Sequence, residues 1–359
     1  MEKKLSNISA PNYTIYFNEE AYTFLEEHLN NHNYSKLFIL TDSNTHEYCL
    51  PWFLSQLVTD IPFEILEMEV GEVHKNIHTC DSIWQALAEL EADRSSLFIN
   101  LGGGVVTDLG GFVASTFKRG IDFLHVPTSL LAMVDAAIGG KNGVDLGAIK
   151  NQIGVIQPPF AVLIDTTFLE SLPQSEMRSG LAEMLKHGLI YDCNYWEQFQ
   201  RLDELTGEDL DLLVHRSVVI KNEIVQQDPF EKGIRKALNF GHTLGHAIES
   251  YFMESDTHNA ILHGEAVAAG MILESHIALQ KGLLKEDDYV TIKSTLTTLF
   301  DKLHIGIEQI ENLHYWMKFD KKNSHGKVKF VLLQGIGKVV VDQEVDDDMI
   351  INALTDYNI

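Results

Sequence analysis

The first half of the chain alternates short apolar runs with segments whose apolar residues recur at helical spacing. Helical spacing is found in Glu19–Leu29 and Ile77–Glu91. Six runs between such segments have the length and residue types of strands: Tyr13–Phe17, Leu37–Thr41, Phe63–Met68, Leu97–Leu101, Phe123–Pro127 and Val162–Ile164. This alternation predicts a mostly parallel sheet covered by helices.

The second half has a different pattern. From Ser175 to Leu279 apolar residues recur at helical spacing, and a late pair of β-type runs, Val328–Leu333 and Gly337–Val341, predicts a hairpin. We therefore expect an α/β fold with an N-terminal Rossmann-like domain, residues 1–172, and a mainly α-helical C-terminal domain, residues 173–359. The boundary should fall near residues 165 to 175.

Charge narrows the classes of partner. Lys and Arg total 27 against 52 Asp and Glu, a net charge of -25, which opposes binding to nucleic acid or to an anionic membrane surface. In such an acidic chain, clustered Lys and Arg residues are stronger evidence of an anion-binding site than usual.

Cys49, Cys80 and Cys193 are far apart, so we expect neither a disulfide framework nor a thiolate zinc site. With no apolar run of signal or membrane-spanning length, we expect a cytoplasmic protein.

A glycine-rich turn follows the fourth predicted strand. Gly102, Gly103 and Gly104 lead into a helical pattern that includes Asp108. Glycines at such a turn let backbone amides approach a phosphate at the start of a helix, and a dinucleotide pyrophosphate is the natural ligand. The spacing differs from the Rossmann fingerprint, so cofactor binding and a plain tight turn both remain open.

Three histidines suggest a metal centre. His242 and His246 are four residues apart, on one helix face, and His263 opens the next helical pattern. Together, beside Asn239, they are sufficient for a catalytic zinc site, although each alone is more often a core or capping histidine. On a separate helix, Glu183 could complete the metal shell or form an exposed i, i+3 ion pair with Lys186. Spacing does not decide whether His246, Glu183 or His187 is the third ligand.

Cations recur in or beside segments read as polar loops. A pocket for a phosphate or carboxylate is the expected use of such cations in a chain this acidic. The residues are Lys118, Arg119, Lys141, Lys150, Lys221, Arg235, Lys321 and Lys322.

Taken in order, these motifs resemble the 3-dehydroquinate synthases, a sugar-phosphate cyclase family within a superfamily that also includes glycerol dehydrogenases. The resemblance runs through most of the chain. It is carried by the motifs around Glu72 and Lys75, Gly103 to Asp108, Phe117 to Gly120, Pro127 to Asp135, Gly139 to Lys141, Lys150 to Gly154, Gly180 to Lys186, Leu238 to His246, His263 to Val267 and Asp320 to Lys322.

The resemblance implies two cofactors and a role for each motif. It implies NAD and one divalent metal, usually zinc but also Co2+ or another ion, bound by Glu183, His242 and His263. His246 becomes an acid/base catalyst. The other substrate contacts implied are Arg119, Asp135, Lys141, Asn151, Lys186, Lys221, Arg235, Asn239 and either Lys321 or Lys322. The NAD contacts implied are Asp42, Asn44, Glu72, His74, Lys75, Gly103, Gly104, Val105, Asp108, Thr128, Ser129, Lys141, Lys150, Phe168, Leu169, Glu170 and Ser171.

The implied reaction is that of a phosphorus–oxygen lyase of the shikimate pathway, which leads to chorismate and aromatic amino acids. The small sugar-phosphate substrate, 3-deoxy-D-arabino-heptulosonate 7-phosphate, is transiently oxidised by NAD, loses phosphate, is reduced again, opens and closes to 3-dehydroquinate by an aldol step. The residue at Arg119 reaches a second subunit in the family, so a homodimer is implied.

Alternatives and departures remain. A cyclase that makes a cyclitol and a polyol dehydrogenase of the glycerol dehydrogenase type share parts of the pattern, but Arg235, Asn239 and His246 favour the dehydroquinate reaction. Ser129, Met133 and Asn142 replace residues common in the family. They leave the charged residues in place and put only the fine geometry of NAD and phosphate binding in doubt.

Overall fold

The computed structural model describes residues 5–147, 149–200, 207–254, 261–317 and 328–359. The chain divides into two compact units, Met1–Met177 and Arg178–Ile359. Helix α6 (Gln174–Tyr191) begins at the end of unit 1 and continues into unit 2. The described helices include none that is both long enough and apolar enough to cross a bilayer.

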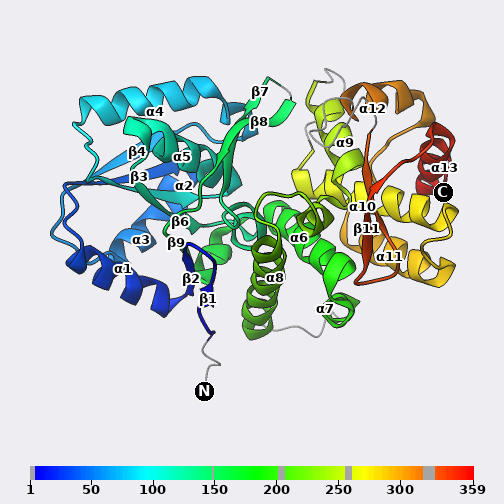
Figure 1. The fold of residues 1–359 in the computed structure, drawn as a ribbon, viewed down its shortest axis with the longest axis horizontal. Coiled ribbons are helices and arrows are strands. Elements are labelled where there is room, and N and C mark those ends of the chain that lie inside the picture. Colours follow the sequence, from blue (N-terminus) through cyan, green and yellow to red (C-terminus); the bar gives the residue numbers. More distant parts are fainter. Residues whose placement is uncertain (1–4, 148, 201–206, 255–260, 318–327) are drawn as a thin grey trace. The chain divides into compact units, whose positions relative to one another are not determined.

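Unit 1 is built on a seven-stranded sheet with the order β1-β2-β9-β6-β5-β3-β4 (Figure 1). All neighbours are parallel except the antiparallel pair β1 and β2. The α/β prediction is confirmed. The strands are β1 (Ile8–Ser9), β2 (Thr14–Phe17), β3 (Leu37–Asp42), β4 (Phe63–Met68), β5 (Leu97–Gly102), β6 (Asp122–Pro127) and β9 (Ala161–Ile164).

Helices cover both faces of this sheet, which explains why β3, β5 and β9 are buried along their whole length. On one face, α4 (Ile77–Glu89) and α5 (Gly104–Thr116) pack on a core that includes Phe38, Leu40 and Phe98. Helices α1 (Glu19–Asn31) and α3 (Leu50–Gln56) lie on the other face (Figure 1), and α2 (Ser43–Tyr48) follows β3.

An antiparallel hairpin, β7 (Lys141–Leu146) and β8 (Ile149–Ile156), was not predicted. Its residues include glycines and charges, so its sequence lacks the apolar alternation of a strand. Lys141, Lys150 and Asn151, which were expected in or beside polar loops, lie in the paired strands of this hairpin.

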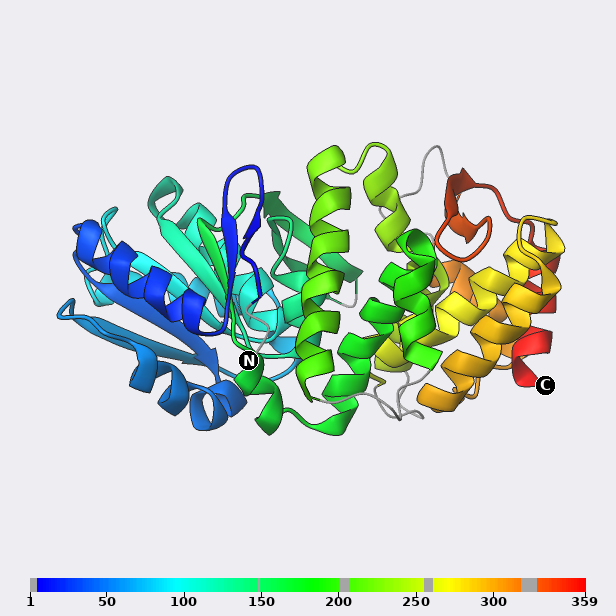
Figure 2. The same ribbon diagram turned by 90° about the horizontal axis from the view of Figure 1, so that it is seen from below.

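Unit 2 is mainly helical, as predicted. Helix α10 (His263–Gln280) is apolar around most of its circumference and contacts α9 (His242–Glu254), α11 (Glu286–Leu299), α13 (Asp347–Asn358) and β10 (Phe330–Leu333) (Figure 2). The predicted C-terminal hairpin is confirmed as β10 (Phe330–Leu333) and β11 (Val339–Gln343). The remaining helices are α7 (Cys193–Gln198), α8 (Gly207–Gln227) and α12 (Ile310–Met317).

Glycines bring α9 and α10 close together. A Cβ atom at Gly270 would lie 2.0 Å from the Gly241 carbonyl oxygen, and one at Gly245 would lie 3.1 Å from the Ala266 carbonyl oxygen. Gly241 also has φ +77°, which a side chain would strain. This close approach fixes the distance between the two helices that carry the histidines.

Candidate metal centre and cofactor-binding residues

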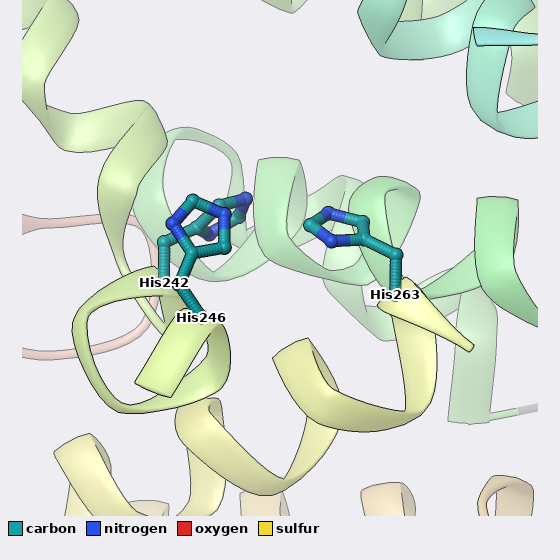
Figure 3. Close-up of side chains that lie close together, drawn as sticks. All are labelled: His242, His246 and His263. Atoms are coloured by element: carbon teal, nitrogen blue, oxygen red, sulfur yellow. The ribbon is translucent and has the colours of Figure 1, made fainter. Parts of the chain in front are cut away.

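The three histidines predicted to form a metal centre lie together at the start of two helices. His242 is the first residue of α9, His246 lies one turn later, and His263 is the first residue of α10. One ring nitrogen from each lies within 4.8 Å of the others, and His263 faces the two rings of α9 (Figure 3). The prediction that two adjacent helices bring the histidines together is confirmed.

Glu183 of α6 joins this group. Its Oε1 lies 3.3 Å from His242 Nε2 and 3.5 Å from His263 Nε2. The carboxylate is fully buried, and neither of its oxygens has a hydrogen-bond partner of suitable geometry among the described residues. Because Lys186, in contact with Oε2, is also buried, the alternative of an exposed ion pair is wrong.

The outer nitrogens of two histidines are occupied. Nδ1 of His242 donates to the Phe240 carbonyl oxygen at 3.0 Å, and Nδ1 of His263 donates to Glu249 Oε2 at 3.1 Å. Each ring therefore directs its other nitrogen, Nε2, toward Glu183. A carboxylate or carbonyl behind the ring is the usual support of a histidine that binds a metal. A divalent cation fits these residues, with His246 or Glu183 available as the third ligand.

The electrostatics of this group favour positive charge. Burial alone would raise the pKa of Glu183, but Lys186 and His242 hold it well below its usual range. Burial would lower the pKa of His263, yet Glu249 and Glu183 raise it to about 10. The carboxylates around the histidines thus favour a cation at this position.

Three polar residues that support the site were missed from the sequence. Glu274 of α10 accepts hydrogen bonds from the backbone N–H groups of Gly241, Thr243 and Leu244, which fixes the start of α9. The Ser179 hydroxyl accepts from the Gly264 N–H at 2.9 Å, which fixes the start of α10. Glu249 is seven residues after His242, so its helix face was predictable. For Glu274 and Ser179 the sequence holds no such signal.

Other residues predicted to bind substrate in unit 2 are buried or partly buried and lie in helices. Lys221 lies within α8, and Arg235 and Asn239 lie in a 3-10 helix, Ile234–Asn239. The sequence placed these cations in or beside polar loops, whereas Lys221 lies inside a helix and Arg235 next to a glycine-containing loop, and they are 5% and 2% exposed. The Asn239 amide donates to Glu231 Oε1 at 2.5 Å, a partner the sequence did not indicate. Lys321 and Lys322 lie outside the described residues.

The residues predicted to bind NAD lie after the strands of unit 1. Gly103 precedes α5 and leaves its N-terminus without a side-chain cap, and a Cβ atom there would lie 3.3 Å from the Ser129 hydroxyl. The turn is therefore shaped to leave amides open to an anion. The other members lie at the start of α2, in or next to two 3-10 helices, in the first turns of α5 and in the turn after β6: Asp42, Asn44, Glu72, His74, Lys75, Val105, Asp108, Thr128, Phe168, Leu169, Glu170 and Ser171.

Lys75 and Lys150, both expected at the cofactor, share a buried cluster of charges. Lys75 Nζ lies 3.1 Å from Glu72 Oε1 and 3.2 Å from Asp108 Oδ2. Lys150 Nζ lies 2.9 Å from the same Glu72 oxygen. Asp145, which the sequence did not indicate, faces both lysines.

The remaining candidates of unit 1 are placed by backbone features. Arg119 ends a 3-10 helix, Phe117–Arg119, with φ +69°, and Asp135 lies in a π-helix, Ala132–Ala136.

Two of the residues that depart from the family pattern contribute to packing or to backbone hydrogen bonding. Met133 is fully buried, and the Asn142 amide donates to the Gln157 carbonyl oxygen at 2.7 Å within the β7–β8 hairpin.

Comparisons with known proteins agree with this geometry. Sequence models of the 3-dehydroquinate synthase N-terminal and C-terminal domains match residues 65–179 and 180–323. The 3-dehydroquinate synthase of Parabacteroides distasonis is 41% identical over 93% of this chain and 94% of its own length. That of Helicobacter pylori is 35% identical over 100% of both chains.

A solved structure supports the fold. The 2-epi-5-epi-valiolone synthase of Streptomyces hygroscopicus, solved with NAD+ and Zn2+ bound, superposes with a TM-score of 0.83 at 26% identity and covers 99% of both chains. The identity and coverage of the sequence relatives are sufficient to assign a family. The chain belongs to the 3-dehydroquinate synthase family.

Proposed function

We propose that this protein converts 3-deoxy-D-arabino-heptulosonate 7-phosphate to 3-dehydroquinate and phosphate, using NAD and a divalent metal. Membership of the family supports the reaction. The observation that carries the proposal is the buried carboxylate of Glu183, which lacks a hydrogen-bond partner among the described residues and faces Nε2 of two histidines. Lys186 contacts Oε2, so Oε1 is the oxygen left to share a cation with the two histidines.

Glu183, His242 and His263 would hold the metal, zinc or Co2+, in unit 2. When bound, the metal polarises a substrate oxygen, and NAD accepts a hydride and returns it, so that no net oxidation occurs. Three protein ligands leave a position open for the substrate, as in other catalytic zinc sites. This choice leaves His246 off the metal.

His246 is then available for proton transfer. Its ring lies 5.0 Å from His242 and 5.7 Å from His263, measured between ring centroids, so it can reach a group bound at the metal. Around it, Lys186, Lys221, Arg235 and Asn239 would orient the carboxylate and hydroxyls of the substrate. Burial of these cations strengthens their pull on an anion.

In unit 1, the open N-terminus of α5 and the residues after the strands would bind NAD, with Lys141 as a further contact. Arg119, Lys141 and Asn151 would bind the substrate phosphate, with Lys322 or Lys321, and Asp135 would lie beside the ring of the substrate.

We further propose a cytoplasmic homodimer in which Arg119 contributes to substrate binding in the partner subunit. Analytical ultracentrifugation tests the dimer, and Arg119→Ala should reduce turnover without changing zinc content.

The test of the reaction is direct. Purified protein with zinc and NAD should release phosphate from the heptulosonate phosphate, and absorbance at 340 nm should show no accumulation of NADH. Net formation of NADH from glycerol would instead identify a polyol dehydrogenase. Turnover of a substrate that lacks the carboxylate, without turnover of the heptulosonate phosphate, would identify a cyclitol-forming enzyme.

A further inference from the structure

Hairpin β7–β8 loses its regular register at Asp145. Val144 pairs with Ile153 and Leu146 pairs with Ile149, so Asp145 alone faces the β8 segment from Lys150 to Gln152. A bulge of this kind redirects side chains and is common beside active sites. The first two residues of this β8 segment are Lys150, assigned above to the cofactor, and Asn151, assigned above to the substrate phosphate.

The Asp145 carboxylate fixes the backbone of this bulge. Its Oδ1 accepts a hydrogen bond from the Asn151 N–H at 2.6 Å, and Asn151 has φ +52°, in the left-handed region. Asparagine tolerates that region better than most residues other than glycine, and the hydrogen bond to Asp145 favours it further. Asp145 is itself fixed, because its own N–H donates to the Lys75 carbonyl oxygen at 2.9 Å.

The same carboxylate faces the two lysines of the charge cluster. Its oxygens lie 3.9 Å from Lys75 Nζ and 3.8 Å from Lys150 Nζ. Asp145 is 7% exposed, so these charges act with little screening by water. Glu72 and Asp108 are the other carboxylates of the cluster, and they contact the lysines more closely.

We propose that Asp145 is a positioning residue that serves two binding functions at once. It holds Asn151 in the backbone conformation used for the substrate phosphate, and it holds Lys150 beside Glu72 for the cofactor. The inference rests on the proposed function, since that assigns Lys150 and Asn151 their ligands.

A dependence on pH accompanies this role. Burial, and then Glu72, raise the pKa of Asp145 to about 6, although Lys75 and Lys150 oppose the rise. Asp108, which contacts Lys75, is the other charged residue of this cluster. Below pH 6 the protonated carboxyl would hold Lys150 and the Asn151 N–H less strongly.

Two substitutions separate the hydrogen bond from the charge. Asp145→Asn keeps an oxygen that can accept from the Asn151 N–H, whereas Asp145→Ala removes both. With zinc-loaded protein at pH 7.5, Asp145→Ala should raise the KM for the sugar phosphate and the Kd for NAD roughly tenfold each, with a smaller change in kcat. Asp145→Asn should restore the KM to within roughly threefold of the wild type. Asp60→Ala, at an exposed carboxylate before β4, is the control.

The pH profile gives a second measurement. The kcat/KM of the wild type should fall below pH 6, and that fall should be smaller in Asp145→Asn. Equal KM and Kd values in wild type and Asp145→Ala would overturn the inference, as would equal losses in the Ala and Asn variants at pH 7.5. NAD binding is measured by calorimetry without turnover, so an inactive wild type that binds NAD would refute the proposed reaction and still test Asp145.

Discussion

Glu249 accepts a hydrogen bond from Nδ1 of His263 at 3.1 Å, so a residue of α9 fixes the ring that opens α10. Removing its charge should loosen that ring and weaken the metal site. We expect Glu249→Gln to raise the Kd for zinc roughly tenfold or more. Zinc competition with a chromophoric chelator measures this. Glu254→Gln, at an exposed position of the same helix, is the matched control, and an equal rise there would contradict the role of Glu249.

The division of roles among the histidines has a simple test. His263→Ala should lose zinc from the purified protein, because it removes a ligand. His246→Ala should keep zinc but lose activity by roughly a hundredfold or more, because it removes a proton-transfer group. Metal analysis by mass spectrometry and phosphate release measure the two effects. Equal loss of zinc from both variants would show that His246 is a ligand.

The close contact between Gly264 and Ser179 predicts a cost for any side chain at position 264. A Cβ atom there would lie 2.3 Å from Ser179 Cα and 2.6 Å from its carbonyl oxygen. Gly264→Ala should lower the free energy of unfolding by about 1 to 3 kcal/mol and also weaken zinc binding, since His263 is adjacent. Ser179→Ala removes only the hydroxyl and should cost about 1 kcal/mol. Urea denaturation compares the two, and a neutral Gly264→Ala would contradict the packing.

A buried histidine of unit 1 predicts loss of stability in acid. Burial lowers the pKa of His125 to about 3, although Asn142 opposes this, and its Nδ1 lies 3.2 Å from the Asn100 amide. The folded state therefore disfavours the charged ring. This contribution to stability is complete above the unfolded pKa of about 6.5 and declines as the pH falls toward 3.

At pH 5 the loss from His125 should be roughly 2 kcal/mol relative to pH 7. His125→Gln cannot titrate, so its free energy of unfolding should change less between these pH values. Urea denaturation at both pH values gives the comparison. His32→Gln, at an exposed histidine, is the control. A variant at position 125 that keeps the full pH dependence of the wild type would show that other groups cause it.

The main features of the fold could be predicted because apolar residues repeat regularly. Strands such as Phe63–Met68 and helix α4, predicted as Ile77–Glu91 and observed as Ile77–Glu89, follow directly from those repeats. Hairpin β7–β8 could not be predicted, since Gly143 and Gly154 pair across it with almost no space between the strands. Backbone contact, and not an apolar pattern, holds that pairing.

Spacing alone establishes proximity only where members of the site are close in sequence. His242 and His246 share a helix face, so their proximity follows from spacing. Glu183 lies on a different helix from both histidines, and no periodicity connects it to them. Its contacts depend on how α6, α9 and α10 pack, which the sequence specifies only through tertiary structure.

The buried carboxylate of Glu274 has a consequence for the cation itself. A helix begins with a partial positive charge, and His242 is the first residue of α9. A bare helix start would repel a doubly charged ion held by that histidine. Because Glu274 accepts hydrogen bonds from three amides of this turn, its negative charge cancels the repulsion. The start of α9 can thus carry a metal ligand without opposing the metal's charge.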